Sequence, residues 1–342
     1  MTERGGMVER TCWCGAKRAR HRFEARAAHD ASRRPFRYVE CAGCGVLAMH
    51  PALEDATLAT YYAGEYYGAS PRKFVGPIAR MVAKFQGARA ELVDEFVTQP
   101  RHLAAQPLSP RFSRAAPGRP RMRILDVGCG NGGFLMQLKR RGYRVEGTEW
   151  TAAAAARVPA AARIRVRVGD LTTLPLPHHG YDAVTLWHVF EHLRDPDATM
   201  ACIAQLLRPR GLVFLSLPNQ ESLQAAAFGP HWFHLDPPRH LHGFGPRSLG
   251  ALLERHGFAV RRRHTWSMEQ NPYGVMQSAL NAAGFPRERA YARLKGTAPR
   301  GGAAALGDFA MLAALAPLGF AWAGVESALG RGGTMTVVAE KV

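Results

Sequence analysis

Residues 124–135 combine a short apolar run, an acid and a glycine-rich turn, and they are the part of the chain best suited to chemistry. Glycines stand at 128, 130 and 132, and helix-forming residues continue to Arg141. Glycine permits positive φ and leaves no Cβ between the backbone and a ligand, so a nucleotide-like molecule can lie against the loop and the helix N-terminus. The pattern therefore predicts a strand, a turn and a helix that bind such a molecule.

The glycines alone do not identify the ligand, because the spacing of Gly128, Gly130 and Gly133 also satisfies the G-x-G-x-x-G dinucleotide pattern. The acids that end two predicted strands have to be considered as well. Asp126 ends the predicted strand, where it would repel a pyrophosphate but attract a cationic amino acid group. Glu149 ends the next predicted strand, about 20 residues beyond the loop, where an acid can accept hydrogen bonds from ribose hydroxyls. Asp126 thereby favours S-adenosylmethionine over a dinucleotide, whereas either cofactor would use Glu149.

Three further segments follow in a familiar order. Residues 164–168 alternate like a strand and lead to Asp170 and Leu171, which could take an adenine amino group and cover its ring. Residues 181–187 and 212–217 are predicted as a fourth and a fifth strand. This succession, over about residues 122–270, resembles the class I S-adenosylmethionine-dependent methyltransferases, and the joint occurrence of the motifs is far more specific than a glycine pattern.

The resemblance implies a fold, a cofactor and its binding residues. The fold is an α/β, doubly wound, Rossmann-like sheet of seven strands, with strand six near 258–266 and an antiparallel seventh strand at 334–340. The cofactor is S-adenosylmethionine. The residues expected to bind it are Asp126, Gly128, Gly130, Gly132, Glu149, Asp170, Leu171 and Trp187.

Two histidine-rich segments follow the predicted fourth and fifth strands, at the edge where an open parallel sheet binds ligands. A sulfonium methyl group is already electrophilic, so the enzyme mainly aligns a nucleophile and, for a hydroxyl, removes its proton. We predict His240 as the general base, Asp236 or Glu191 orienting it, and His188 near the methionine part of the cofactor. The loop of His240 resembles one that carries a histidine base in sugar-modifying relatives. Four histidines would also suit a catalytic metal, but no H-x-x-x-H pair on a predicted helix supports one.

Four of the six cysteines form two close pairs near the amino terminus, Cys12 with Cys14 and Cys41 with Cys44. In a reducing compartment such pairs suit the four thiolate ligands of a structural zinc ion better than disulfides. The first pair is C-x-C, one residue short of the usual pattern, and metal-free cysteines or a redox pair are the alternatives. The expected role of zinc is to fold residues 1–50, a zinc-ribbon-like module without a core of its own.

The rest of the chain divides by composition. Residues 51–97 contain a tyrosine cluster at 61–67, which could contact a substrate or pack between modules, and then apolar positions at helical spacing over 77–97. Residues 98–121 are rich in proline and arginine and predict a flexible linker. The methyltransferase core is expected over 122–342, with a helical insertion at 270–333 before the last strand.

The insertion contains an uncharged stretch, residues 309–325. This stretch is shorter than the roughly 20 residues that span a bilayer. A buried helical lid is the main expectation. An interfacial helix near a lipid-linked substrate, with peripheral membrane contact through 305–329, is the alternative.

Length and charge bound the functions. The chain has 342 residues, 47% of them hydrophobic, and a formal net charge of +18. The charge would suit nucleic acid or an anionic surface, but it is nearly all arginine in an alanine-rich chain, so coding bias explains it equally well. No apolar leader marks the amino terminus, so a cytoplasmic location is expected.

Three functions are compatible with these observations. The first is methylation of a small molecule, at an oxygen or carbon of a sugar, a glycan precursor or a natural product. The second is RNA methylation, for which the cysteine module and the basic charge would serve as a binding surface. The third is a cofactor-binding regulator without activity. A nucleic acid partner is less expected than a small-molecule acceptor, and the oligomeric state is open.

Overall fold

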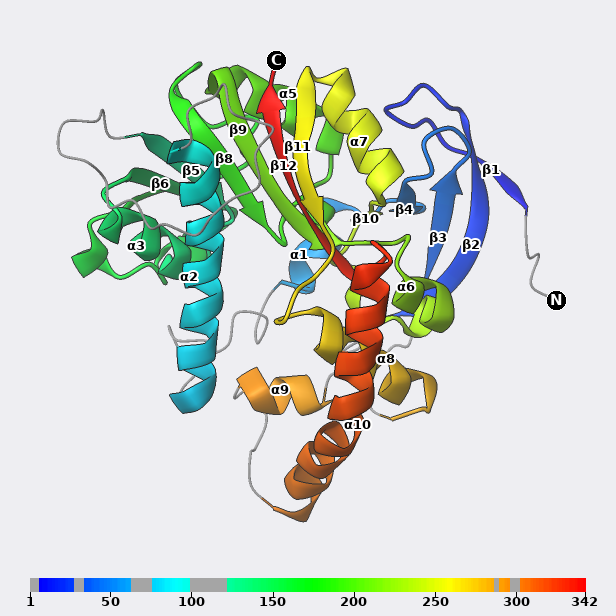
Figure 1. Ribbon diagram of the computed structural model, residues 1–342. Helices are drawn as coiled ribbons and strands as arrows, with labels where there is room; N and C mark the ends of the chain where they lie inside the picture. The colour runs from blue at the N-terminus through cyan, green and yellow to red at the C-terminus, as the bar shows by residue number, and fades with distance from the viewer. Residues whose placement is uncertain (1–5, 28–33, 63–75, 99–121, 286–288, 296–301) are drawn as a thin grey trace.

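The computed structural model describes residues 6–27, 34–62, 76–98, 122–285, 289–295 and 302–342. Its centre is a seven-stranded sheet in the order β11-β12-β9-β8-β5-β6-β7 (Figure 1). The strands are β5 (Arg123–Val127), β6 (Arg144–Glu149), β7 (Arg165–Val168), β8 (Tyr181–Trp187), β9 (Leu207–Pro218), β11 (Phe258–His264) and β12 (Thr334–Lys341). Only β12 runs antiparallel to its neighbours in this sheet. The predicted doubly wound sheet with an antiparallel last strand is therefore confirmed.

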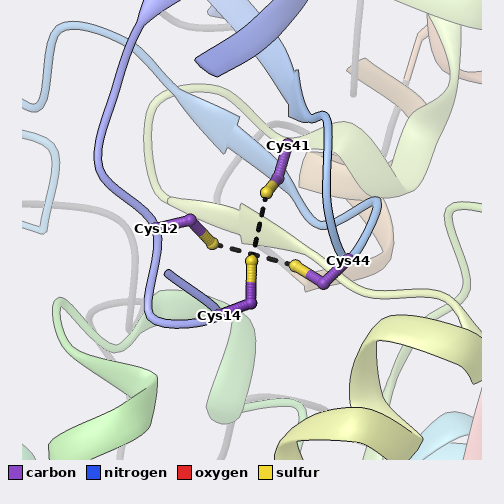
Figure 2. Close-up of side chains that lie close together, drawn as sticks. All are labelled: Cys12, Cys14, Cys41 and Cys44. Carbon is purple, nitrogen blue, oxygen red and sulfur yellow. Dashed lines mark hydrogen bonds between the residues drawn. The ribbon is translucent and has the colours of Figure 1, made fainter. Parts of the chain in front are cut away.

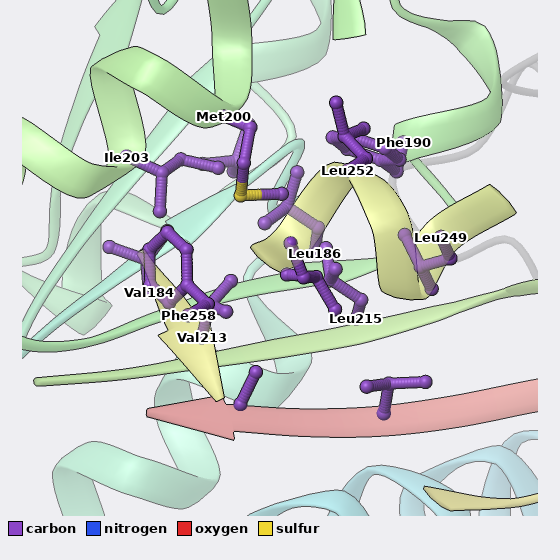
Figure 3. Packing of buried hydrophobic residues seen from close by; sticks show 14 of the residues in the cluster. Val184, Leu186, Phe190, Met200, Ile203, Val213, Leu215, Leu249, Leu252 and Phe258 are labelled. Carbon is purple, nitrogen blue, oxygen red and sulfur yellow. The ribbon is translucent and has the colours of Figure 1, made fainter. Parts of the chain in front are cut away.

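Helices cover both faces of this sheet because its central strands are apolar on both sides. On one face lie α2 (Gly76–Thr98) and α3 (Gly133–Arg140), which pack with Ile124 and Phe214 of the strands. On the other face α5 (Pro196–Leu206) and α7 (Pro246–Arg255) cover Leu186 and Leu215 (Figure 3). A short α4 (Ala152–Ala155) follows β6.

The amino-terminal segment forms a second, antiparallel sheet in the order β1-β2-β3-β4-β10. Its strands are β1 (Met7–Glu9), β2 (Arg18–Arg26), β3 (Pro35–Cys41), β4 (Leu47–Met49) and β10 (His242–Gly243). The last of these belongs to the segment that follows His240, and it pairs through His242 with Ala48. The amino-terminal module is thus joined by backbone hydrogen bonds to the histidine-rich loop of the core.

The lead-in contributes α1 (Asp55–Thr60) and then the predicted helix, which is α2. Tyr61 and Tyr62 are described, whereas Tyr66, Tyr67 and residues 99–121 of the expected linker lie outside the described residues. After β9 the chain forms α6 (Leu223–Phe228) and the histidine-rich loop.

The insertion before β12 consists of α8 (Asn271–Ala282), α9 (Arg289–Lys295) and α10 (Ala303–Ala328). These helices project from one end of the central sheet (Figure 1). The predicted apolar stretch is only part of α10, which is 26 residues long. Only 17% of the most apolar 18-residue segment of this helix is buried. The expectation of a buried lid is therefore wrong: α10 packs along α8 with one side and leaves the rest of its surface open.

Candidate active site

One large cavity, with a volume of about 1020 Å³, lies at the carboxyl ends of β5, β6, β8 and β9. It brings together nearly all the residues that the sequence singled out for cofactor binding and catalysis. Those that line it are Asp126, Gly128, Gly130, Glu149, Asp170, Leu171, Trp187, His188, Glu191, Asp236 and His240. Gly132 does not line the cavity.

The glycine loop needs glycine for two separate reasons. Gly128 has φ +68°, and a Cβ there would stand 2.5 Å from a methyl group of Val189. Gly132 has φ +72° and is the N-cap of α3, where a Cβ would come within 2.9 Å of Val158. Gly130 has φ +59° and open space beside it. Gly132 therefore shapes the turn, while Gly130 leaves room against the backbone for a ligand.

Asp126 stands at the floor of the cavity and is almost completely buried, with 2% of its surface exposed. Its carboxylate accepts a hydrogen bond of 2.6 Å from the Thr185 hydroxyl. Burial raises the pKa of Asp126 to about 7, against the opposing effects of that hydrogen bond and of the Arg89 charge. A cationic ligand beside this carboxyl group would favour its ionised form, and the resulting carboxylate would attract the ligand.

The other two acids predicted to bind the cofactor, Glu149 and Asp170, differ in their surroundings. Glu149 is buried and accepts a hydrogen bond from the Gly130 amide, and burial raises its pKa. Asp170 is half-buried, and one carboxylate oxygen holds the turn by accepting from the amide and the hydroxyl of Thr172, at 2.8 and 2.6 Å. Both line the cavity at the ends of neighbouring strands, as the sequence predicted.

Helix α2 closes one wall with residues that sequence reasoning missed. Arg89 lies 5.4 Å from the ring centroid of Trp187 and pairs with Glu269, which also lines the cavity. The indole nitrogen of Trp187 is buried and has no hydrogen-bond partner among the described residues. Sequence analysis predicted the helix, but a single arginine in an arginine-rich chain carries no signal that it faces a ligand.

His240 occupies the opposite wall, and a backbone carbonyl orients it. Its Nδ1 lies 2.8 Å from the carbonyl oxygen of His234, whereas its Nε2 is 3.9 Å from a carboxylate oxygen of Glu191 and 3.9 Å from one of Asp236. Asp236 instead holds Arg239 through two hydrogen bonds, of 3.0 and 2.6 Å. The two acids thus face the nitrogen expected to act as base, and neither orients the ring through the other nitrogen.

Glu191 is the most isolated acid of the site. It is 1% exposed, and neither carboxylate oxygen has a hydrogen-bond partner among the described residues. Burial would raise its pKa, but the neighbouring His188, 3.7 Å away, and the charges of His240 and His192 outweigh burial and hold it at about 2. Glu191 is therefore ionised at neutral pH, a buried charge that faces imidazoles only.

His192 is a further histidine of the site, which the sequence offered only as a secondary candidate for the base. Its Nδ1 lies 3.0 Å from both the Tyr62 hydroxyl and the Arg239 carbonyl oxygen, and its ring lies 4.5 Å from that of His240. Burial lowers its pKa to about 4, so the ring is neutral at pH 7. The ligand atoms of Glu191, His192 and His240 all lie within 4.8 Å of one another.

The amino-terminal module supports this wall directly. The hydroxyl of Tyr38, on β3, donates to the carbonyl oxygen of His240 at 3.1 Å. The side chain of Gln220 donates to the carbonyl oxygen of Gly45, and β10 pairs with β4. Tyr38 and the pairing of β10 therefore connect the cysteine-containing module to the loop of His240, and Gln220 connects it to the segment after β9.

The four predicted cysteines converge at the end of that module (Figure 2). The sulfur atoms of Cys12 and Cys44 are 3.7 Å apart, those of Cys14 and Cys41 are 3.5 Å apart, and all four lie within 4.8 Å of one another. None forms a disulfide. A tetrahedral zinc ion with bonds of about 2.3 Å holds its sulfur ligands roughly 3.8 Å apart, so the cluster fits such an ion.

Comparisons with known proteins find similarity over the core of the chain. Residues 100–262 match the family model described as a methyltransferase domain. That match covers just under half of the chain, and together with the strand order it is consistent with the resemblance to class I S-adenosylmethionine-dependent methyltransferases that the motifs carry. A solved structure of a SAM-dependent methyltransferase from Archaeoglobus fulgidus aligns with a TM-score of 0.46 and 17% identity, over 76% of this chain and 94% of its own.

Three relatives are similar over part of this chain. A probable S-adenosylmethionine-dependent methyltransferase of Mycolicibacterium smegmatis is 32% identical over 40% of this chain and 52% of its own. A ubiquinone biosynthesis O-methyltransferase of Nitrosospira multiformis is 29% identical, over 44% and 66%. An indolepyruvate C-methyltransferase of Streptomyces griseus is 33% identical, over 39% and 44%. The chain thus spans between 44% and 66% of these relatives, and the reaction of the whole protein is a matter of proposal.

Proposed function

We propose that the protein transfers a methyl group from S-adenosylmethionine to an oxygen or carbon of a small molecule, such as a sugar, a glycan precursor or a natural product. The observation that carries the proposal is that one cavity is lined both by the donor acids and by the histidine loop. Relatives named for O- and C-methylation of small molecules support the same class of acceptor.

The donor region fits S-adenosylmethionine. Asp126 would take the amino group, Glu149 the ribose hydroxyls and Asp170 the adenine amino group, with Leu171 against the ring and Trp187 beside the methionine part. The raised pKa of Asp126 and the open space at Gly130 are what such a ligand requires. The cofactor supplies an electrophilic methyl group, and the protein has only to place an acceptor in line with it.

His240 acts as the general base in this proposal. With its Nδ1 proton on the His234 carbonyl, its Nε2 carries the lone pair and faces the cavity side where Glu191 and Asp236 lie. When Nε2 takes a proton from the acceptor, the two carboxylates stabilise the resulting imidazolium. His188, whose backbone has φ +55° directly after β8, would stand beside the methionine part of the cofactor.

The test is an acceptor screen with S-adenosylmethionine labelled in the methyl group. Sugars, nucleotide-linked sugars, aromatic natural products and RNA are offered separately, and product is counted with and without protein. Labelled small-molecule product supports the proposal. Label only in RNA would assign the second function, and cofactor binding without transfer to any class would assign a regulator.

A second mechanism at the same wall is favoured by the unpartnered oxygens of Glu191. A divalent cation held by Glu191, His192 and His240 could bind an acceptor oxygen and lower its pKa, in place of a free base. Dialysis against a chelator discriminates the two. Turnover that survives chelation assigns His240 as a base, whereas turnover lost and restored by Mn²⁺ assigns the three side chains as ligands.

We also propose that Cys12, Cys14, Cys41 and Cys44 bind a structural zinc ion. Elemental analysis should find one zinc per chain, and Cys14→Ser should lose it, while Cys202→Ser, at a cysteine far from the cluster in sequence, should keep it. Because the module supports the loop of His240, loss of zinc should increase hydrogen exchange in β10 more than in β5. Full metal content in Cys14→Ser would refute the ligand assignment.

A further inference from the structure

Helix α10 exposes an apolar surface that the fold leaves uncovered. Six large apolar side chains on it or just after it are at least one-third exposed: Leu306 (72%), Leu318 (69%), Phe320 (45%), Trp322 (39%), Val325 (59%) and Leu329 (64%). We call these six residues the α10 surface. Soluble monomers rarely expose apolar patches of more than a few hundred Å², and larger ones mark an interaction site.

The helix hides both of its charges. Asp308 is 7% exposed and accepts a hydrogen bond of 2.7 Å from Arg293 of α9. Glu326 is fully buried and accepts from the Gln224 side chain at 2.6 Å and from the Gly333 amide at 2.9 Å. The 26 residues of α10 contain no other ionisable side chain, so its open side carries no charge along its whole length.

The width of the α10 surface argues for a lipid bilayer over a second copy of the chain. At about 100° per residue, Phe320 and Trp322 bound an exposed arc of roughly 200° around the helix. Docking against another helix covers a stripe of only about 100°. A bilayer interface covers every side that faces it. A surface for a protein partner would also be rimmed by polar side chains.

Charge and attachment define how the helix meets the bilayer. Residues 270–333 contain six basic and three acidic residues, and two of those acids are the buried Asp308 and Glu326. One of the six basic residues, Arg293, is also buried, and the remaining charged residues of this segment still carry a net positive charge, which complements anionic lipid. The helix packs along α8 and is followed by β12 of the central sheet, so it lies in the interface and does not cross it.

The same insertion walls the acceptor side of the cavity. Gln270, just before α8, and Tyr291 of α9 line the cavity, and the Tyr291 ring lies 5.7 Å from that of Phe233 on the histidine loop. We propose that the α10 surface docks the protein on an anionic bilayer. Provided that the proposed methyl transfer is correct, docking would present the cavity to an acceptor anchored in that bilayer by an apolar tail.

The experiment is co-sedimentation of the full chain with vesicles of phosphatidylcholine alone and with equal parts of phosphatidylglycerol. We expect binding to the mixed vesicles, weakened by salt. The double variant Leu318→Glu and Val325→Glu should bind at least about tenfold more weakly, because each change removes an apolar side chain from the interface. Val342→Glu is the matched control, since Val342 is 77% exposed at the opposite end of the molecule (Figure 1), and it should bind like the wild type.

Three results would overturn the inference. One is failure of the wild type to sediment with mixed vesicles, and another is undiminished binding by the double variant. The third is a concentration-dependent dimer, seen by sedimentation velocity, that the double variant abolishes, which would assign the surface to a second copy. Affinity for S-adenosylmethionine, measured in parallel, separates these outcomes from failure of the methyl transfer proposal, because no residue of the α10 surface lines the cavity.

Discussion

The two walls of the cavity are built in different ways. One wall, called here the donor wall, carries the residues proposed to bind the cofactor. It comes from short segments in which the functional residue lies at the end of a strand or in the turn that follows, as Asp126, Gly130 and Glu149 do. The opposite wall, called here the acceptor wall, carries His240 and is not built from such strand-turn segments. His240 is held there by a carbonyl of its own loop and by the Tyr38 hydroxyl, from a strand about 200 residues earlier in the chain.

The difference teaches where specificity resides in this molecule. A donor wall made from local strand-turn units is rigid wherever the sheet is intact. The acceptor wall depends on the amino-terminal module, on Tyr62 of the lead-in and on the insertion, each of which joins it through a few hydrogen bonds or ring contacts. Under the proposed function, the parts outside the sheet would therefore select the acceptor.

The strongest test of this division is His240→Ala. It removes the proposed base, so methyl transfer to the acceptor found in the screen should fall by about 10²- to 10⁴-fold. Affinity for S-adenosylmethionine, measured by calorimetry, should change less than about twofold, because His240 belongs to the opposite wall. His179→Ala, at a histidine outside the cavity, is the control. Unchanged turnover in His240→Ala would exclude the base assignment.

The converse test is Asp126→Ala, which should damage only the donor wall. Loss of a charge-assisted hydrogen bond of about 1.5–3 kcal/mol predicts an affinity for S-adenosylmethionine roughly 10- to 100-fold lower. Asp182→Ala removes another buried acid from the same sheet, one that does not line the cavity. It should lower stability without changing that affinity. Equal losses of affinity in both variants would mean that Asp126 acts through the fold alone.

The same contrast explains what the sequence could predict. Apolar runs and turn residues determine the strands locally, and the order of motifs indicated the sheet and most of the predicted cofactor-binding residues that line the cavity, but not Arg89. The carbonyl of His234 that orients His240 could not be foreseen, because every residue has a carbonyl and only the path of the loop selects one. The sequence predicts Asp236 or Glu191 as the group that orients His240, and the structure has the carbonyl of His234 in that role.

Helix α10 shows a second limit of the sequence. Its apolar composition predicted a helix, and the natural place for an uncharged helix is the core. Whether such a helix is covered depends on what packs against it, and here α8, α9 and α6 cover only part of its surface. The stretch 309–325 therefore carried information about local structure and none about burial.

A change of pH should sharpen the comparison, because the two walls titrate differently. Burial raises the pKa of Asp126 to about 7, so its carboxyl is protonated below that pH and loses its charge for a cationic group. Affinity for S-adenosylmethionine should thus level off above pH 7 and fall by up to about tenfold for each pH unit below it, until the roughly 10- to 100-fold contribution of the charge is lost. Asp126→Asn should flatten the profile. The neighbouring Glu149, with its own raised pKa, would account for any dependence that persists in that variant.

The sign of the stability effect is opposite. A carboxyl group whose pKa is raised by folding stabilises the fold in its protonated form, so the free protein should lose stability as pH rises from about 4 to 7. Thermal unfolding without cofactor, compared between wild type and Asp126→Asn, measures this contribution of Asp126 to stability. A wild type that gains more stability than the variant over that range would contradict the raised pKa.

The smallest expected effect tests the support of the acceptor wall. Tyr38→Phe removes only the hydroxyl that donates to the His240 carbonyl, which should cost about 1 kcal/mol of stability. Because that bond holds the loop of the base, turnover should fall a few-fold while affinity for S-adenosylmethionine stays constant. Tyr181→Phe is the matched control: it removes a hydroxyl that donates to Glu146 at 2.6 Å, away from the cavity. If both variants lower turnover equally, stability alone explains the effect, and the module does not position the base.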